Sequence, residues 1–244
     1  MAKAAAGTTK NAPQAETPPR RRLRPAERSR RIVEEAASFF AEHGLETSTR
    51  ELADRLGVAQ ALIYRYFPSK QALIERVFET TFVRLWDDAW DALIADRARP
   101  LEECLVRLYV AYMERADSVA VRLFVRAGLD GADMARRYSV PLTDQMLRPV
   151  IAELRADCGL PDFERRPMMR GERELAMILH GAVVFLGIRK HVYGMPMPDD
   201  MTDLVRLQVG TFLEGARSQL RRLHAGDAED SLTVEQLDRR RRRG

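Results

Sequence analysis

Cysteine is nearly absent from this 244-residue sequence. Its two cysteines, Cys104 and Cys158, lie far apart and lack the Cys-x-x-Cys spacing of a zinc or redox site. His43, His191 and His224 show no metal-binding spacing with either cysteine. We therefore expect no disulfide scaffold, no metal and no cofactor, and a reducing compartment fits this composition best.

Long hydrophobic runs are missing as well. No apolar stretch reaches the roughly 18 residues that a membrane span needs, and the first residues, MAKAAAGTTKNAPQAETPPRRRLR, contain no apolar core of a secretory signal. Alternating runs of Val, Ile and Thr, which indicate strands, are scarce. We expect a cytoplasmic protein without a membrane partner and with little or no sheet.

The residues that are present favour helices packed around a core. Hydrophobic residues make up 45% of the chain and charged residues 31%, and Ala, Leu, Arg and Glu, which are good helix formers, recur throughout. The length allows one large domain, or one small domain and one medium domain. The predicted fold class is therefore all-α.

Positive charge is concentrated at the two ends of the chain, although the formal net charge is only +4. Residues 1–31 contain nine Lys or Arg against two Glu, and Arg239–Arg243 form a run of five arginines, so the part between them is acidic. We interpret residues 1–23 as a disordered basic arm and residues 225–244 as a basic tail. Such ends suit a polyanionic partner or serve only for solubility, and charge alone favours neither.

The first folded segment begins as two helices with clear boundary signals. Pro25 suits the first turn of a helix that runs to about Glu42, and Gly44 supplies the residue that ends it. The Ser48-x-x-Glu51 pattern is typical of a capping box, which opens a short helix over Thr49–Leu56. These signals predict a long helix followed by a short one.

Two further helices follow at once. Gly57 suits a tight turn, a third helix spans Ala59–Phe67 and stops at Pro68, and Ser69 caps a fourth helix that begins at Lys70. Two short helices joined at a glycine and braced by a longer one form a helix-turn-helix. Its expected buried anchors are Phe39, Phe40, Leu52, Val58, Ile63, Phe67 and Leu73.

The stretch from Arg28 to Glu75 resembles the DNA-binding domain of the TetR family of bacterial regulators. The residues that match the family pattern are Ala53, Leu56, Gly57, Val58, Ile63, Tyr64, Phe67, Ser69, Lys70, Leu73 and Ile74. The resemblance implies an N-terminal three-helix DNA-binding domain at 24–75. It also implies a larger helical ligand-binding and dimerisation domain at 76–224.

The third helix carries the expected DNA-reading side chains. With Val58, Ile63 and Phe67 facing inward, the outward residues are Gln60, Ala61, Leu62, Tyr64 and Tyr66. The resemblance assigns bases to Gln60, Ala61 and Leu62, assigns the DNA backbone to Thr49, Tyr64, Tyr66 and Lys70, and allows either for Arg50. Many family members carry a small or hydroxyl residue where Leu62 stands, so the operator cannot be copied from a relative. The alternative is that the two tyrosines only fill a helix junction.

The hydrophobic pattern predicts longer helices in the rest of the chain. One is predicted to run without a break through Val77, Phe78, Phe82, Trp86 and Trp90. The others cover roughly residues 101–116, 118–128, 131–157, 171–192 and 200–223, with breaks at proline and glycine.

Two of these helices suit a homodimer interface. The segment Leu175–Ile188 is apolar nearly all round, and Gly181, Ala182 and Gly187 allow close helix approach. The last helix repeats Leu204, Leu207, Thr211, Phe212, Gly215, Ala216, Gln219 and Leu223 along one face. Two such helices from each subunit would form a two-fold four-helix interface, and the alternative is two ordinary core helices.

A ligand pocket is expected among large side chains of the middle helices. The candidates are Trp86, Trp90, Tyr109, Tyr112, Met113, Phe124, Met146 and His180. Such residues at helical spacing more often form core. Tyr109 and Tyr112 are the preferred partners for a polar group of a ligand, whereas a lone histidine on an apolar helix is more often a hydrogen-bonded core residue.

Together these features predict a homodimeric repressor, not an enzyme. Its partners would be a double-stranded, palindromic DNA operator and a small apolar effector, which releases the operator by favouring a state in which the helix after Lys70 swings. One alternative is an all-helical enzyme, although the sequence shows no nucleophile–base spacing or phosphate-binding loop. Another is an activator or a ligand-independent DNA-binding protein.

Overall fold

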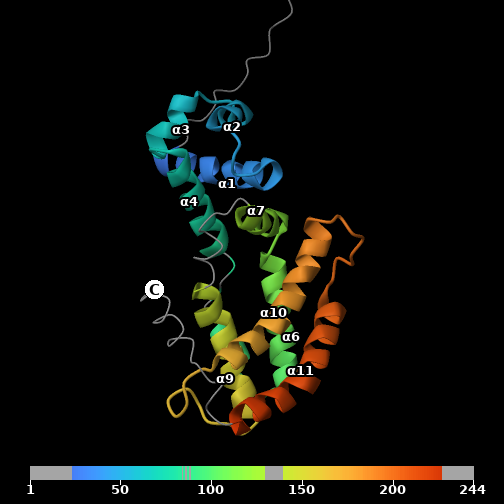
Figure 1. The fold of residues 1–244 in the computed structure, drawn as a ribbon. Helices are drawn as coiled ribbons and strands as arrows, with labels where there is room; N and C mark the ends of the chain where they lie inside the picture. Colours follow the sequence, from blue (N-terminus) through green and yellow to red (C-terminus); the bar gives the residue numbers. More distant parts are fainter. Residues whose placement is uncertain (1–23, 84, 86, 88, 130–139, 227–244) are drawn as a thin grey trace, which may run out of the picture.

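The computed structural model describes residues 24–226 except 84, 86, 88 and 130–139. The predicted arm at 1–23, nearly all of the predicted tail at 225–244, and Trp86 lie outside the described residues. The described part is helical, which confirms the all-α class (Figure 1). None of its helices has the length and hydrophobicity that crossing a bilayer requires.

The N-terminal helices follow their predicted boundary signals. α1 (Pro25–His43) has its proline in the first turn and ends at Gly44, whose φ is +91°. α2 (Thr49–Leu56) begins with the predicted capping box, because the Ser48 hydroxyl accepts from the Glu51 amide and the Glu51 carboxylate accepts from the Ser48 amide. Gly57 adopts the left-handed conformation that ends α2.

The next two helices complete the helix-turn-helix. α3 (Gln60–Tyr66) is flanked by Ala59 and Phe67 as its cap residues. α4 (Lys70–Val83) starts where Ser69 accepts a hydrogen bond from the Ala72 amide. Both starting points agree with the prediction.

The continuous helix predicted through residues 77–90 is wrong. α4 ends at Val83, and a separate short helix, α5 (Ala89–Ile94), follows. The Asp87 carboxylate accepts from the Ala89 amide and pairs with Arg115 of α6, so a side chain caps α5 and fixes the new direction. The sequence carries neither proline nor glycine at this break, which is why periodicity missed it.

The larger body consists of the remaining helices. They are α6 (Leu101–Arg115), α7 (Ser118–Leu129), the π-helical turn η1 (Thr143–Leu147), α9 (Arg148–Asp157), α10 (Arg170–His191) and α11 (Thr202–Ala225). Pro149 explains η1, because its missing amide and its ring cannot continue an α-helical ladder, and the Arg148 amide instead bonds the Thr143 carbonyl.

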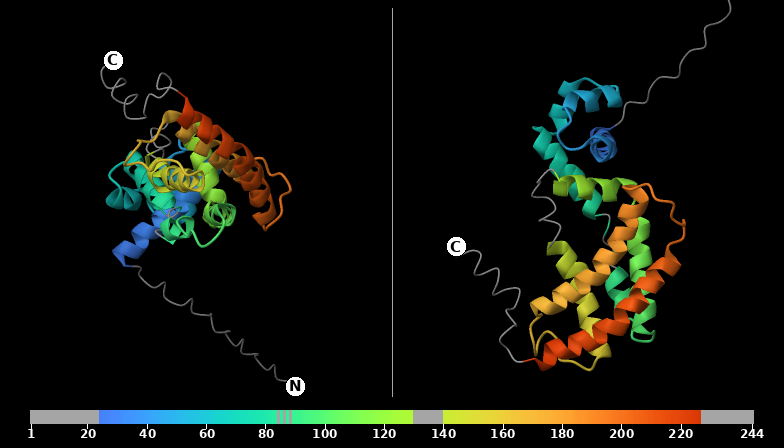
Figure 2. Two further views of the ribbon diagram at one scale, coloured as in Figure 1. Left: turned by 90° about the horizontal axis from the view of Figure 1, so that it is seen from below. Right: turned by 45° about the vertical axis from the view of Figure 1, so that its right-hand side comes forward.

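Two hydrophobic cores are stacked along the molecule. One holds α1–α4 at one end, and the other lies among α5, α6, α9, α10 and α11 (Figures 1 and 2). α7 lies between them and contributes Leu123 and Ala127 to the N-terminal core. Phe82 on α4 packs against both cores. α4 and α7 are therefore the two physical links between the halves.

A buried ion pair connects α9, α10 and α11 at the end of the body that lies away from the N-terminal helices. Arg155 on α9 bonds Glu172 on α10 through two nitrogen–oxygen contacts of 2.7 and 2.6 Å, and both side chains are fully buried. His224 near the end of α11 contacts the same carboxylate at 2.9 Å. The Arg155 guanidinium also donates to the carbonyls of Pro161 and Arg166 in the connection before α10. One charge cluster thus holds three helices and a loop together.

Candidate nucleic-acid interface and cavity

α3 is anchored on one side and open on the other. Ile63 and Phe67 are buried in the N-terminal core. Gln60, Ala61 and Tyr64 are exposed, and Tyr64 has 43% of its surface accessible. This placement leaves the side of α3 that is predicted to meet DNA accessible.

A hydroxyl on α2 holds two of these side chains in place. The Gln60 amide nitrogen donates to Thr49 Oγ1 at 2.7 Å, and the Tyr64 hydroxyl lies 2.9 Å from the same oxygen. Thr49 itself is only 5% exposed. The hydrogen bonds to Thr49 therefore restrict the orientations of the Gln60 and Tyr64 side chains.

Two residues that were predicted to contact the DNA backbone are less exposed than helical periodicity suggests. Thr49 is buried in the α2–α3 contact, and its hydroxyl is engaged by Gln60 and Tyr64. Tyr66 is only half-exposed and packs against the N-terminal core, so it does not face fully outward. Leu62 is also half-buried. Hydrogen bonds between α2 and α3 hold Thr49, and helical periodicity alone does not reveal them.

The cations around α3 fall into two groups. Arg55 is bound by Glu35 and Glu42 of α1, and its hydrogen bond lowers the pKa of Glu42. Arg50 and Arg65 are exposed and have no acidic partner among the residues that the structure describes. Sequence reasoning missed Arg65, although its position two residues after Ile63 places it on the opposite side of a helix.

A cavity of about 150 Å³ lies in the body between α6, α7 and α10. Its described lining also includes residues of α4, the segment after α4, and Leu142. The lining residues are Phe82, Leu85, Tyr112, Ala116, Ala120, Val121, Phe124, Val125, Leu142, Met177, His180, Gly181, Val184 and Ile188. The wall that these residues form is almost entirely apolar.

Two buried polar atoms at this cavity lack a hydrogen-bond partner. They are Nδ1 of His180, a residue that lines the cavity, and the hydroxyl of Tyr109, whose ring lies beside that of His180. The His180 ring centroid is 6.1 Å from that of Tyr109 and 5.3 Å from that of Tyr112. Burial lowers the pKa of His180 to about 4 and raises that of Tyr109, so both side chains are neutral at physiological pH.

The predicted pocket residues divide between wall and core. Tyr112, Phe124 and His180 line the cavity. Four others lie in or against the core without lining it: Trp90, Tyr109, Met113 and Met146. Apart from Phe124 on α7 and His180 on α10, the lining from these two helices was not predicted, because small and aliphatic residues at these positions resemble ordinary core.

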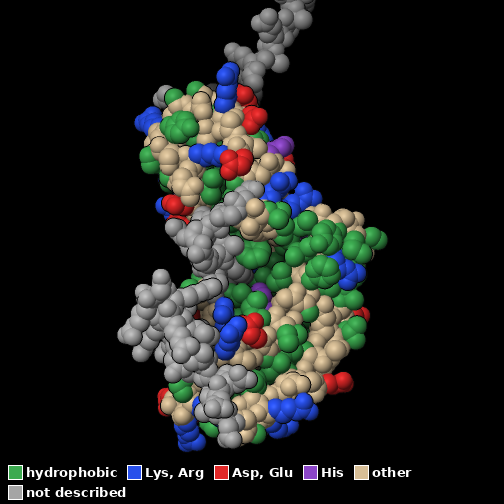
Figure 3. Space-filling model, in the orientation of Figure 1, with side chains coloured by type: hydrophobic (Ala, Val, Ile, Leu, Met, Phe, Trp, Pro, Cys, Tyr) green, Lys and Arg blue, Asp and Glu red, His purple; other side chains and the backbone are tan. Residues whose placement is uncertain are grey.

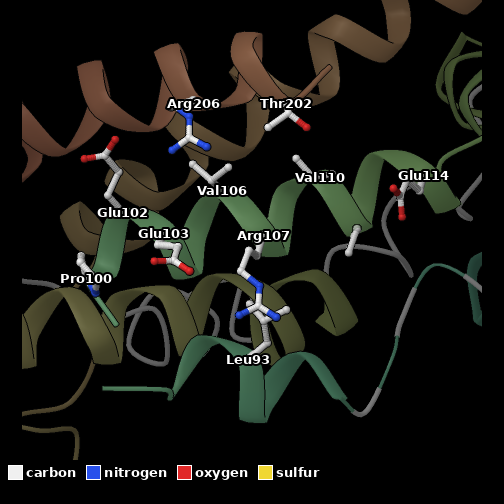
Figure 4. Close-up of a pocket in the computed structure, with 11 residues that line it drawn as sticks. Leu93, Pro100, Glu102, Glu103, Val106, Arg107, Val110, Glu114, Thr202 and Arg206 are labelled. Carbon is white, nitrogen blue, oxygen red and sulfur yellow. The ribbon is translucent and has the colours of Figure 1, made fainter. Parts of the chain in front are cut away.

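A second, more open hollow of about 810 Å³ lies along α6 between α5 and α11. Figure 4 shows acidic Glu102 and Glu103 and basic Arg107 and Arg206 spread along it. Charges of both signs that face solvent are typical of a hydrated surface groove. We assign it no ligand.

α7 contacts both the cavity and the N-terminal domain. Val121 and Phe124 line the cavity. On another side of the helix, the Arg126 guanidinium donates to the carbonyls of Ala41 and Glu42 at 3.0 and 2.8 Å, where α1 ends. One helix therefore contacts both the cavity and the end of α1.

The outer side of α10 and α11 exposes large hydrophobic residues. Ile178 and Leu207 have about two-thirds of their surface accessible, and Phe185 about half. α10 and α11 run side by side (Figures 1 and 2). Further hydrophobic side chains gather beside α7 and the neighbouring end of α10 (Figure 3). Phe212, Ala216 and Gly187, by contrast, pack within the subunit.

Comparison with known proteins gives a family match over the N-terminal helices. A model described as bacterial regulatory proteins of the tetR family matches residues 32–77. The HTH-type transcriptional repressor KstR2 of Mycolicibacterium smegmatis is 31% identical over 91 residues, 37% of this chain and 43% of that protein. The HTH-type transcriptional regulator BetI of Rhizobium meliloti is 29% identical over 144 residues, 57% of this chain and 70% of that protein. The match therefore spans less than half the length of the first relative.

A solved structure shares the fold over most of the chain. A TetR-like transcriptional regulator from Rhodococcus sp. RHA1 superposes with a TM-score of 0.61 at 19% identity, and covers 80% of this chain and all of its own. The matched residues 32–77 contain Thr49, Gln60 and Tyr64, the hydrogen-bonded group on α2 and α3. Residues 32–77 therefore match the tetR family of bacterial regulatory proteins, and the chain is similar to regulators of that family.

Proposed function

We propose that this protein is a homodimeric repressor that places α3 in the major groove of an operator and leaves it when a small molecule fills the cavity. The observation that carries the proposal is the open side of α3, with Gln60 and Tyr64 held by Thr49. An exposed tyrosine fixed beside an exposed amide presents ordered hydrogen-bonding groups, which suit the wall of a DNA groove.

The proposed base contacts use the polar atoms of Gln60 that are not bonded to Thr49. Gln60 uses one amide hydrogen on Thr49, which leaves its other hydrogen and its carbonyl oxygen for an adenine edge. Ala61 and Leu62 offer apolar contacts to a thymine methyl group. The proposed contacts to DNA bases are therefore made by Gln60, Ala61 and Leu62 in the first turn of α3.

Backbone contacts surround this centre. Tyr64, Arg50, Arg65 and Lys70 supply a hydroxyl and positive charges to phosphates. Lys70 also stands at the start of α4, where free amides favour an anion. Thr49 acts indirectly, as the positioning residue.

Dimerisation is assigned to the outer side of α10 and α11, which exposes Ile178, Phe185 and Leu207. A two-fold pair of these helices would bury the apolar side chains against their copies. It would also present two α3 helices to half-sites about one helical turn apart, which calls for a palindromic operator.

Ligand release is assigned to the two links between the cores. α4 has Lys70 at the DNA-facing end and Phe82 in the cavity wall. α7 has Phe124 in the wall and Arg126 on α1. A ligand that moves either wall favours a state with a different spacing of the two α3 helices.

The test begins by selecting bound fragments from the genomic DNA of the source organism with the full-length protein. Fluorescence anisotropy then measures affinity for the recovered fragments. The double variant Tyr64→Ala/Lys70→Ala should lose at least about a hundredfold in affinity while helicity and dimerisation stay unchanged. Arg107→Ala, at an exposed arginine of the α6 groove, is the control and should bind as the wild type does. Binding by the double variant at wild-type strength would contradict the assignment of α3.

A further inference from the structure

The volume, the charge and the unpartnered polar atom of the cavity together indicate a class of ligand. We infer that it takes a compact, uncharged single-ring molecule bearing one hydroxyl group, and that Nδ1 of His180 is the hydrogen-bond partner of that hydroxyl. The inference rests on the proposed ligand-responsive function and specifies the chemistry of its effector.

Size sets the first limit. The cavity measures about 150 Å³, and an engineered apolar cavity of about that volume in another protein binds benzene. One ring therefore matches the volume between the described walls. A long acyl chain or a fused ring system exceeds that volume.

Charge sets the second limit. The described residues of the wall include no acidic or basic side chain, and His180 and Tyr112 are the polar ring side chains among them. Burial holds His180 in its neutral form. A carboxylate would lose its hydration in this wall without gaining an opposite charge, so an uncharged ligand is favoured.

The unpartnered nitrogen sets the third limit. Nδ1 of His180 is buried without a hydrogen-bond partner, and the histidine is 3% exposed. In the neutral ring this nitrogen either donates or accepts, depending on the tautomer. A hydroxyl group can accept or donate in turn, so it satisfies both tautomers, whereas a methyl group satisfies neither. The buried Tyr109 hydroxyl also lacks a partner, and the Tyr109 ring lies 6.1 Å from the His180 ring between centroids.

Three ring compounds test these limits on the full-length protein without DNA. Toluene and phenol have the same number of heavy atoms, and benzoate adds a charge at pH 7. Isothermal titration calorimetry should give phenol an affinity about tenfold above toluene, because one hydrogen bond to a buried group is gained. Benzoate should bind at least about tenfold more weakly than phenol. Equal affinities for phenol and toluene, tightest binding of benzoate, or no binding of any probe would each overturn the inference.

A variant then tests the residue. His180→Phe keeps a ring and removes Nδ1, so phenol should fall to the level of toluene while toluene binds at least as tightly as before. Tyr109→Phe, which does not line the cavity, should preserve most of the preference for phenol. A His180→Phe protein that still prefers phenol tenfold would refute the role of Nδ1. If this variant does not fold, the wild-type comparison of the three probes decides alone.

Operator release is measured separately, by adding phenol to the protein–DNA complex. Phenol that binds as expected without releasing DNA would contradict the proposed repressor mechanism and leave the ligand class standing. Release by a charged or much larger molecule, with no phenol binding, would support the repressor mechanism and overturn the ligand class.

Discussion

Thr49 is the residue on which the orientation of the DNA-facing side chains depends. Its hydroxyl is almost fully buried and is shared by an amide from Gln60 and a phenol from Tyr64. Two side chains of α3 are thereby ordered before DNA arrives, so less conformational entropy is lost on binding.

Thr49→Val should weaken operator binding about tenfold, roughly 1.4 kcal/mol, because the shape is kept and the shared hydroxyl is lost. The matched control is Thr202→Val, which removes a hydroxyl from the first residue of α11, far from α3. Anisotropy with the selected operator measures both. Unchanged affinity of Thr49→Val would show that the hydrogen bonds to α3 have no role in binding.

Among the helices, the charged cluster around Glu172 holds α9, α10 and the last turn of α11 together. Arg155 and Glu172 are fully buried and bonded twice, and His224 brings the last turn of α11 to the same carboxylate. Removal of one partner leaves a buried charge without compensation.

Glu172→Gln should therefore lower the free energy of unfolding by about 3 to 5 kcal/mol. Asp157→Asn is the control, because it breaks the more exposed ion pair with Arg217 and should cost no more than about 1 kcal/mol. Urea titrations followed by circular dichroism measure both changes. Equal, small decreases in the free energy of unfolding would mean that the buried ion pair does not stabilise the contact between α9, α10 and α11.

The elements themselves differ in how well the sequence predicts them. Ser48, Gly57 and Ser69 act within a few residues of where they stand, so the boundaries of the helix-turn-helix followed from local chemistry. The break before α5 depends on Asp87 meeting Arg115, which is 28 residues away. The shared role of Thr49 and the lone nitrogen of His180 are likewise tertiary, and periodicity could indicate only which side of a helix is apolar.

At the scale of the whole molecule, the exposed apolar side of α10 and α11 predicts the oligomeric state. Leu207 and Ile178 are among the most exposed large hydrophobic residues of the described chain. Their exposure in a single subunit is what a copy of the same surface would relieve.

Leu207→Arg should raise the dimer dissociation constant at least about a hundredfold, because it places an unpaired charge in the interface. Leu129→Arg is the control, since Leu129 is even more exposed but stands at the end of α7. Analytical ultracentrifugation over a range of concentrations distinguishes the two. A dimer that survives Leu207→Arg would place the interface elsewhere.

The position of α7 also bears on how such a protein can diverge. One helix presents Val121 and Phe124 to the cavity and Arg126 to the end of α1, and these side chains point in different directions. Under the proposed mechanism, substitutions of the wall residues would change the ligand that is sensed, while the hydrogen bonds of Arg126 to α1 are kept. A duplicated gene would then acquire a new inducer by a few substitutions on one side of the twelve-residue α7, with its operator unchanged.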